Sequence, residues 1–168
     1  MPSPVAHGMI ALSVYALVNY RRTSTELLHR NNLVALALIL CLSILPDIDF
    51  LLVVITGNEL AHGGVSHSIV FAAMMCVLLR VAKVTVIPLK VCFLIILSHP
   101  MLDMCTIDGY YPGTKALLWP FTSARYSFNA YLGVFDSLDW ADEKAFYSVA
   151  TIYSVLKEFV VGCIVVLI

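Results

Sequence analysis

Histidine and aspartate side chains recur in short polar motifs along a chain that is otherwise strongly apolar. The motif LPDID contains two aspartates, AHGGVSHS contains two histidines, and SHPMLD contains one of each. Imidazole nitrogens together with carboxylate oxygens suit Zn²⁺, with Mn²⁺ as an alternative, better than they suit a soft metal. The sequence therefore predicts a divalent-metal site. Its candidate ligands are His7, Asp47, His62, His67, His99 and Asp103, with Asp49 as a further candidate.

The spacing within these motifs favours convergence on one ion. His99 and Asp103 are four residues apart, which places both side chains on one face of a helix. Pro100 lies between them and could begin a new turn there. Pro46 disfavours helix at the residue before it, so it interrupts the helix just where the two aspartates of LPDID must point into a polar cavity.

Each motif also has a plainer interpretation. Asp47 or Asp49 could cap a helix after the proline, and Ser66 and Ser68 could cap the helix that follows them. A lone histidine near a helix start is as often structural as a ligand, and His29 lies among arginines, where it would be solvated. Ionisable residues near a membrane are nevertheless costly to keep, which favours a functional site.

The elements that must position these residues are apolar helices. Hydrophobic residues make up 61% of the 168 positions and charged residues 12%, against about 25% charged in an average soluble chain. A chain this short and apolar must have part of its surface covered by lipid. Lipid forces helical structure, and most runs fall short of the roughly 20 residues of a perpendicular span. The apolar runs are Val5 to Asn19, Leu33 to Thr56 interrupted at Pro46, Ser68 to Leu79, Val91 to Met104, and Tyr147 to Ile168.

We therefore expect an all-α fold: a single domain over residues 1–168, built as a polytopic membrane bundle of four to five apolar helices. Basic residues lie in two connections, at Arg21, Arg22 and Arg30 and at Arg80, Lys83 and Lys90. If the helices alternate in direction, both connections lie on one side, which the positive-inside rule makes cytoplasmic. The His and Asp motifs then share the opposite end, so a metal site is expected on the non-cytoplasmic face.

Several functional classes are disfavoured. The net charge of −1 gives no electrostatic reason to expect nucleic acid as a partner. Five cysteines without a CxxC pair argue against a disulfide framework and against a thiolate zinc site. The first apolar run has no basic residue before it, so we interpret it as a retained membrane helix rather than a signal peptide.

The order LPDID, HGGVSHS, LSHPMLDMCT and GTKALLWPF resembles the YdjM-type inner-membrane metal-dependent hydrolases, also described as LexA-binding, inner membrane-associated hydrolases. The resemblance covers about residues 5–128, and residues 129–168 are left as an unassigned loop and a C-terminal apolar helix. That family is grouped with the zinc-dependent phospholipase C and P1 nuclease class, which is all-helical and binds a cluster of zinc ions. The resemblance implies the ligand set given above. One departure is Gly63, where the family usually has Arg; Lys115 or Arg125 could take over its role.

The function expected from these features is metal-dependent hydrolysis in the inner membrane, most naturally of a phospholipid or a lipid-linked phosphoester. One to three ions would activate water, with Asp47 bridging them and Asp49 acting as ligand or general base. The aromatic stretch from Tyr110 to Phe128 would form a rim at the membrane surface, where Lys115 and Arg125 would bind the anionic headgroup. The same stretch could be no more than an interfacial anchor. A metal-ion transporter and a scaffold with a structural metal remain alternatives, and the oligomeric state is open.

Overall fold

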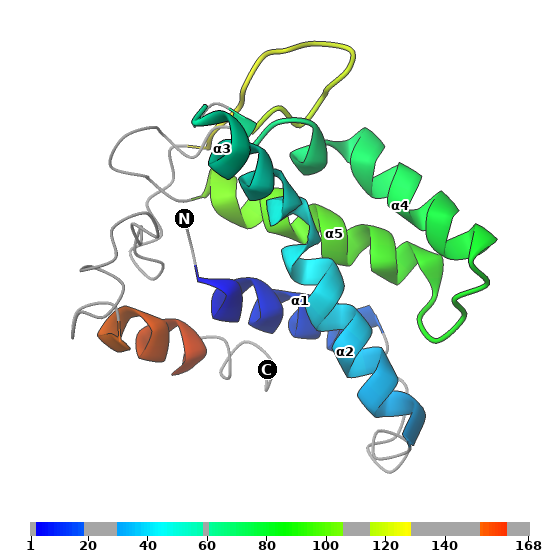
Figure 1. The fold of residues 1–168 in the computed structure, drawn as a ribbon. Helices are drawn as coiled ribbons and strands as arrows, with labels where there is room; N and C mark the ends of the chain where they lie inside the picture. Colours follow the sequence, from blue (N-terminus) through cyan, green and yellow to red (C-terminus); the bar gives the residue numbers. More distant parts are fainter. Residues whose placement is uncertain (1–2, 19–29, 59–60, 106–114, 129–151, 161–168) are drawn as a thin grey trace.

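The structure is a computed structural model that describes residues 3–18, 30–58, 61–105, 115–128 and 152–160. These residues are mainly helical, and the pairing of Lys115 with Tyr126 is an isolated bridge rather than a strand. An all-α fold is therefore confirmed for the described part (Figure 1). Residues 152–160 form a further helical segment. The named elements are α1 Pro4–Val18, α2 Arg30–Ile44, the 3₁₀ helix η2 Leu45–Asp49, α3 Phe50–Thr56, the 3₁₀ helix η4 Val65–His67, α4 Ile69–Val81 and α5 Leu89–Met104.

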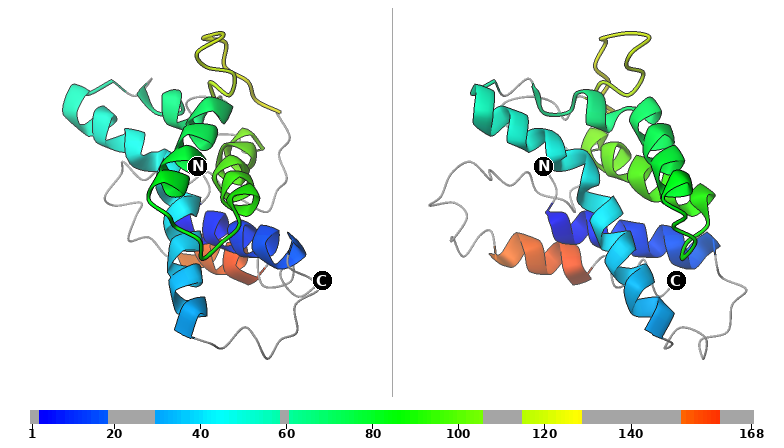
Figure 2. Two further views of the ribbon diagram at one scale, coloured as in Figure 1. Left: turned by 90° about the vertical axis from the view of Figure 1, so that its right-hand side faces the viewer. Right: turned by 45° about the vertical axis from the view of Figure 1, so that its right-hand side comes forward.

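Helix α5 lies at the centre of the bundle and packs against α1, α2 and α4 (Figures 1 and 2). Its residues Val91, Cys92, Ile95 and Ile96 are buried almost completely. Small residues on the surrounding helices allow close approach, as is common between helices in membranes. Gly8 of α1, for example, faces α2, where an added Cβ would lie 3.1 Å from Leu40 Cδ2.

Helices α1, α2, α4 and α5 alternate in direction along the bundle. The starts of α1 and α4 and the ends of α2 and α5 lie at one end of the bundle. His7, His67, His99 and Asp103 contact one another there, and the Ser43 carbonyl near the end of α2 contacts His99. Arg80 lies in the last turn of α4, Lys83 follows that helix, and Lys90 lies in the first turn of α5. These cations are therefore at the other end of the bundle. These three cations and the His and Asp cluster thus lie at opposite ends of the α4–α5 pair.

Pro46 replaces a regular α-helix with the 3₁₀ turn η2, where it occupies one of the first two positions. The chain is helical on both sides of this turn, and Leu33–Thr56 is a 24-residue stretch long and apolar enough to cross a membrane. Among the described residues it alone reaches that length; Pro4–Val18 and Ile69–Val81 are shorter apolar helices. No side chain of α3 is buried, and Val54 and Ile55 are more than two-thirds exposed. Such a surface is unsuited to water and fits contact with lipid.

Helix α4 begins with one of the two serines expected to cap it. The Oγ of Ser68 accepts a hydrogen bond from the backbone N–H of Phe71 at 3.0 Å, so this prediction is confirmed. The same prediction for Ser66 is wrong, because its hydroxyl donates to Asp49 Oδ2 at 2.7 Å. Ser68 rather than Ser66 holds the capping position directly before the helix, and the Ser66 hydroxyl instead bonds to a carboxylate of the polar cluster.

A buried carboxylate connects the two ends of the chain. Glu158 is fully buried and its Oε2 accepts hydrogen bonds from the N–H and the hydroxyl of Ser3. Ser3 in turn caps α1, because its Oγ accepts from the N–H of Ala6 at 3.2 Å. The segment 152–160 therefore fixes the start of α1, the helix that carries His7 (Figure 2).

Replacing Glu158 by Ala should lower the free energy of unfolding by about 1–3 kcal/mol, because two buried donors of Ser3 lose their acceptor. Glu158→Gln keeps an acceptor oxygen and should cost less. Thermal unfolding of the purified protein in detergent would measure both. Phe159→Ala, on the exposed face of the same segment, is the control. Equal losses for Glu158→Ala and Phe159→Ala would contradict the role given to the carboxylate.

Candidate metal centre

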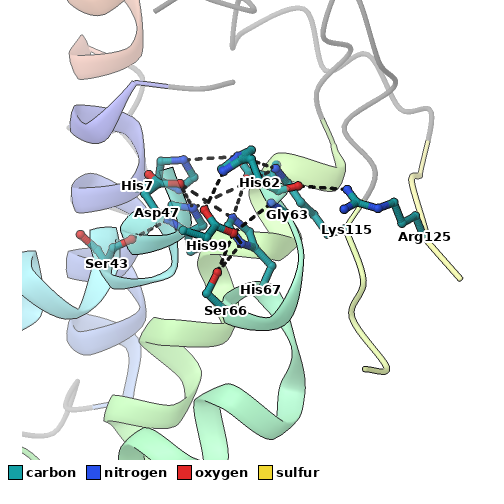
Figure 3. A network of polar contacts seen from close by, with 12 residues as sticks. His7, Ser43, Asp47, His62, Gly63, Ser66, His67, His99, Lys115 and Arg125 are labelled. Atoms are coloured by element: carbon teal, nitrogen blue, oxygen red, sulfur yellow. Dashed lines mark hydrogen bonds and ion pairs between the residues drawn. The ribbon is translucent and has the colours of Figure 1, made fainter. Parts of the chain in front are cut away.

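Four side chains from three different elements, η2, η4 and α5, meet at one point. One ligand atom each from Asp47, His67, His99 and Asp103 lies within 4.8 Å of the other three (Figure 3). The side chains of His67, His99 and Asp103 are at most 1% exposed, whereas that of Asp47 is 24% exposed. The cluster is thus enclosed by protein and reaches solvent at Asp47.

The distances within this group suit the shared binding of one cation. His99 Nε2 lies 3.1 Å from Asp47 Oδ1 and 3.4 Å from Asp103 Oδ2. His67 Nε2 lies 3.4 Å from Asp103 Oδ2 and 3.8 Å from Asp47 Oδ1. Pro100 does not separate the pair in α5, because the helix continues through it and keeps His99 and Asp103 on one face.

The Nδ1 atoms of the histidines are held by acceptors outside this group. Nδ1 of His99 donates to the backbone carbonyl of Ser43 at 2.6 Å, and Nδ1 of His67 lies 3.1 Å from Asp49 Oδ2. His62 Nδ1 donates to the other oxygen of Asp49 at 2.8 Å. Placing the proton on Nδ1 leaves the lone pair on Nε2, and metal-binding histidines are oriented in this way.

Asp49 acts as the common anchor of two histidines and has little capacity left. Its Oδ2 also accepts hydrogen bonds from the Gly63 N–H at 3.0 Å and from the Ser66 hydroxyl. Three donors therefore converge on Oδ2, which has two lone pairs, and one donor contacts Oδ1. The contacts therefore favour orientation of imidazoles over the ligand or general-base role expected for Asp49. The capping interpretation is wrong for this residue, because Asp49 precedes α3 without a side-chain capping bond.

His7 lies at the border of the cluster. Its ring stacks on that of His99 with centroids 3.8 Å apart and planes 16° apart. Its Nε2 is 3.4 Å from Asp103 Oδ1, the oxygen that faces away from the four-residue group. Neither ring nitrogen of the buried His7 has a hydrogen-bond partner among the described residues. His7 lies outside the four-residue group. It is placed to orient the ligand Asp103 through Oδ1 or the ligand His99 through ring stacking.

Lys115 differs most from the sequence-based expectation. It was expected at an exposed rim, but it is 2% exposed, and its Nζ lies 3.0 Å from His62 Nε2 and 3.1 Å from Asp103 Oδ2. Its ammonium group occupies the position between His62 and Asp103, so His62 faces a lysine rather than the four-residue group. Arg125 does lie at the surface, where its guanidinium donates to the His62 carbonyl at 3.0 Å.

Backbone contacts hold Lys115 in this place. The N–H of Ala116 donates to the Gly63 carbonyl at 2.8 Å, and the N–H of Ile69 donates to the Leu117 carbonyl at 3.0 Å. Gly63 has φ of +73°, a value that favours glycine. The loop 115–128 is therefore fixed to the turn before α4 (Figure 1). The aromatic rim is only partly described: Trp119 and Phe121 are exposed, and Tyr110 and Tyr111 lie outside the described residues.

The charge and donor set fit one divalent cation. Three carboxylates and one ammonium group leave the cluster with two negative charges when the imidazoles are neutral, and a single M²⁺ ion would balance them. The buried Nε2 of His67 also has no hydrogen-bond partner among the described residues, which is expected of a nitrogen that binds a metal. In the second possible group, Asp49 with His62 and His67, both Nδ1 atoms already contact the Asp49 carboxylate.

Comparison with known protein families identifies the family of the chain. The profile described as YdjM inner membrane protein matches residues 1–168, the whole chain. The chain belongs to the YdjM inner membrane protein family. Membership places the protein in the inner membrane and covers the C-terminal region that the motifs alone left unassigned. No curated protein and no solved structure matches the chain significantly.

Some contributors to the site in this YdjM family member carry little signal in the sequence. The backbone carbonyl of Ser43 and the hydroxyl of Ser66 orient imidazoles, and neither residue type is distinctive in such a role. Lys115 is buried because its loop packs against the turn before α4, although Lys115 is 48 positions after His67 in the chain. No local sequence pattern reveals such a long-range contact. The single clue is that GTKALLWPF contains a lysine within an otherwise uncharged stretch.

The role of Asp49 can be separated from that of a ligand. Asp49→Asn should weaken metal binding by roughly 10–100-fold without abolishing it, because an outer partner orients the ligands and does not bind the ion. Isothermal titration with Zn²⁺ would measure this. Ser66→Ala removes one of the four donors to Asp49 and should have a smaller effect of the same sign. Complete loss of metal in Asp49→Asn would identify the carboxylate as a ligand.

Proposed function

We propose that the protein is a multi-pass inner-membrane hydrolase that cleaves the phosphoester of a phospholipid or lipid-linked substrate with one divalent ion, zinc being favoured over manganese. One observation carries the proposal. Two imidazoles have Nδ1 tied to outside acceptors and Nε2 directed at Asp47 and Asp103, and the cluster reaches solvent at Asp47, whose side chain is 24% exposed. A structural site would be closed by protein on all sides, whereas a catalytic site keeps access for water.

Each residue has a role in the proposed reaction. His67, His99, Asp47 and Asp103 would hold the ion, which supplies Lewis-acid polarisation and lowers the pKa of bound water toward about 7. Asp47 is the partly exposed member, so its second oxygen can accept a proton from the attacking water. The Lys115 ammonium group can donate hydrogen bonds to a non-bridging phosphoryl oxygen. Water adds to phosphorus, the ester P–O bond breaks, and the proton held by Asp47 passes to the leaving alcohol.

The proposed mechanism uses one ion rather than two or three. The space between His62 and Asp103, where a second cation would find ligands, is filled by the Lys115 ammonium group. A fixed positive charge there can stabilise the same phosphoryl oxygens that a second metal would contact. The count of one also agrees with the two net negative charges of the cluster.

The functional test is turnover by the full-length protein in detergent. Metal-loaded protein is incubated with bis(p-nitrophenyl) phosphate and with a phospholipid in mixed micelles, and a chelator-treated sample is the control. Metal-dependent release of product supports a hydrolase. No turnover, combined with a metal-dependent rise in thermal stability, would favour the structural-site alternative, and uptake of Zn²⁺ into proteoliposomes would favour a transporter.

The proposed orientation places the metal centre on the non-cytoplasmic face, because Arg80, Lys83 and Lys90 lie at the other end of α4 and α5. In a background without native cysteines, Val65→Cys should react with a membrane-impermeant maleimide added to spheroplasts. Thr85→Cys should react only after the membrane is opened. Both residues are exposed, so accessibility within the protein is matched. The reverse labelling pattern would overturn the orientation, and labelling of both from outside would overturn the multi-pass topology.

A further inference from the structure

An apolar groove runs along α1 and α5 and ends beside the metal centre. Its volume is about 420 Å³, and its lining is apolar apart from Ser98. Ile10, Val14 and Leu17 form its wall on α1, and Leu94, Leu97 and Met101 form its wall on α5. The Ser98 hydroxyl is already satisfied by the Ile95 carbonyl at 2.8 Å. The groove therefore presents hydrocarbon and no free polar group among its described lining residues.

The position of the groove relative to the site follows from the helix directions. His7 stacks on His99 at one end of the α1–α5 pair, whereas Leu17 and Leu94 share the groove at the other end. Ile10 comes one turn after His7, and Leu102 and Cys105, which also line the groove, flank Asp103. This end of the groove thus lies within one helical turn of His7 and Asp103 along the two helices.

The length of the groove matches one leaflet of a bilayer. From Leu94 to Cys105, α5 rises about 16 Å at 1.5 Å per residue, and half of the hydrocarbon core is about 15 Å thick. A chain lying in the groove would extend from the membrane interior to the level of the ligands. A volume of this size lies in the range of small-molecule sites.

We propose that this groove binds one hydrocarbon chain of the lipid phosphoester and so places its phosphate at Lys115 and Asp47. This inference rests on the proposed function, and it names the part of the substrate that the protein recognises. Recognition through a chain-length apolar surface predicts little selectivity among headgroups and clear dependence on the chain. It also predicts that a short, soluble phosphodiester is cleaved without help from the groove.

The first test compares two identical substitutions. Leu94→Trp fills the groove, and Leu78→Trp makes the same change on the exposed surface of α4, outside the groove. Leu94→Trp should lower kcat/KM for the micellar phospholipid by about tenfold, the effect expected when roughly two methylene groups lose their buried contact. Its rate on bis(p-nitrophenyl) phosphate should be unchanged, and Leu78→Trp should change neither rate. Equal effects of the two variants on the phospholipid would overturn the groove as a substrate site.

The second test does not depend on turnover. A phosphatidic acid with a diazirine on its acyl chain is photo-crosslinked to the protein in detergent, and labelled peptides are mapped by mass spectrometry. Saturable labelling of α1 and α5 that unlabelled phosphatidic acid reduces, and that Leu94→Trp removes, supports the groove. Labelling that is spread over α4 as well, without saturation, overturns it. If the wild type hydrolyses neither substrate, the proposed function fails, and the crosslinking result alone decides the groove.

Discussion

Replacing Asp103 by Asn will remove bound metal from the protein. Asp103 Oδ2 lies within 3.4 Å of Nε2 of both His67 and His99, and its other oxygen faces His7. Among the described residues, Asp47 also contacts both His67 and His99, but Asp103 alone does so from a fully buried position. We expect Zn²⁺ affinity to fall by more than about 100-fold, since the loss of an outer partner alone costs roughly 10–100-fold. Metal content by mass spectrometry after dialysis, and titration calorimetry, would measure the change.

A second variant is needed to separate the loss of metal binding from a loss of folding. Asp103→Asn also leaves the buried Lys115 ammonium group without its carboxylate, which is costly in itself. His67→Ala removes a neutral ligand and should lose metal to a similar extent while keeping that ion pair. His29→Ala, outside the described residues and in the arginine-containing connection, should bind metal like the wild type. Retention of stoichiometric Zn²⁺ by both Asp103→Asn and His67→Ala would refute the site.

Much of this centre could be predicted from the sequence, because it depends on helix direction. Once α1, α2, α4 and α5 alternate, the ends that carry His7, Asp47, His67 and Asp103 must share one face of the bundle. The i,i+4 spacing in α5 and the break at Pro46 are likewise local, and the structure agrees with both. The first four apolar runs predicted the helix positions to within a few residues, whereas most of the fifth, Tyr147 to Ile168, lies outside the described residues, of which 152–160 are helical.

The sequence does not predict which residues of the cluster bind the ion and which only orient its ligands. Asp47 and Asp49 are two residues apart in one short motif, yet one faces the ligands and the other holds imidazoles from outside. The difference arises from the 3₁₀ turn, whose roughly three residues per turn direct the two side chains to different partners. The burial of Lys115 is set by long-range backbone contacts to Gly63, and the Glu158–Ser3 contact joins residues 155 positions apart.

Lys115→Met should move metal binding and catalysis in opposite directions. The Lys115 ammonium group lies 3.1 Å from Asp103 Oδ2 and competes with a metal ion for that oxygen. Removing the positive charge should therefore raise Zn²⁺ affinity by about tenfold or more, since like charges a few ångströms apart repel strongly in a poorly solvated site. Catalysis should fall, because the variant lacks the donor proposed for the phosphoryl oxygen; loss of one such donor costs about 10²–10³ in kcat.

The metal-free form of the same variant gives a third, independent readout. Without Lys115, Asp103 keeps a buried negative charge with no ammonium partner, and breaking such a pair costs about 3–5 kcal/mol. Saturating Zn²⁺ should restore most of this stability, so the thermal shift on adding metal should be larger in Lys115→Met than in the wild type. Lys90→Met makes the same substitution at an exposed position at the far end of α5 and should change none of the three quantities. A Lys115→Met protein with weaker metal binding would show that the lysine supports the site structurally, and one with wild-type kcat would exclude it from the chemistry.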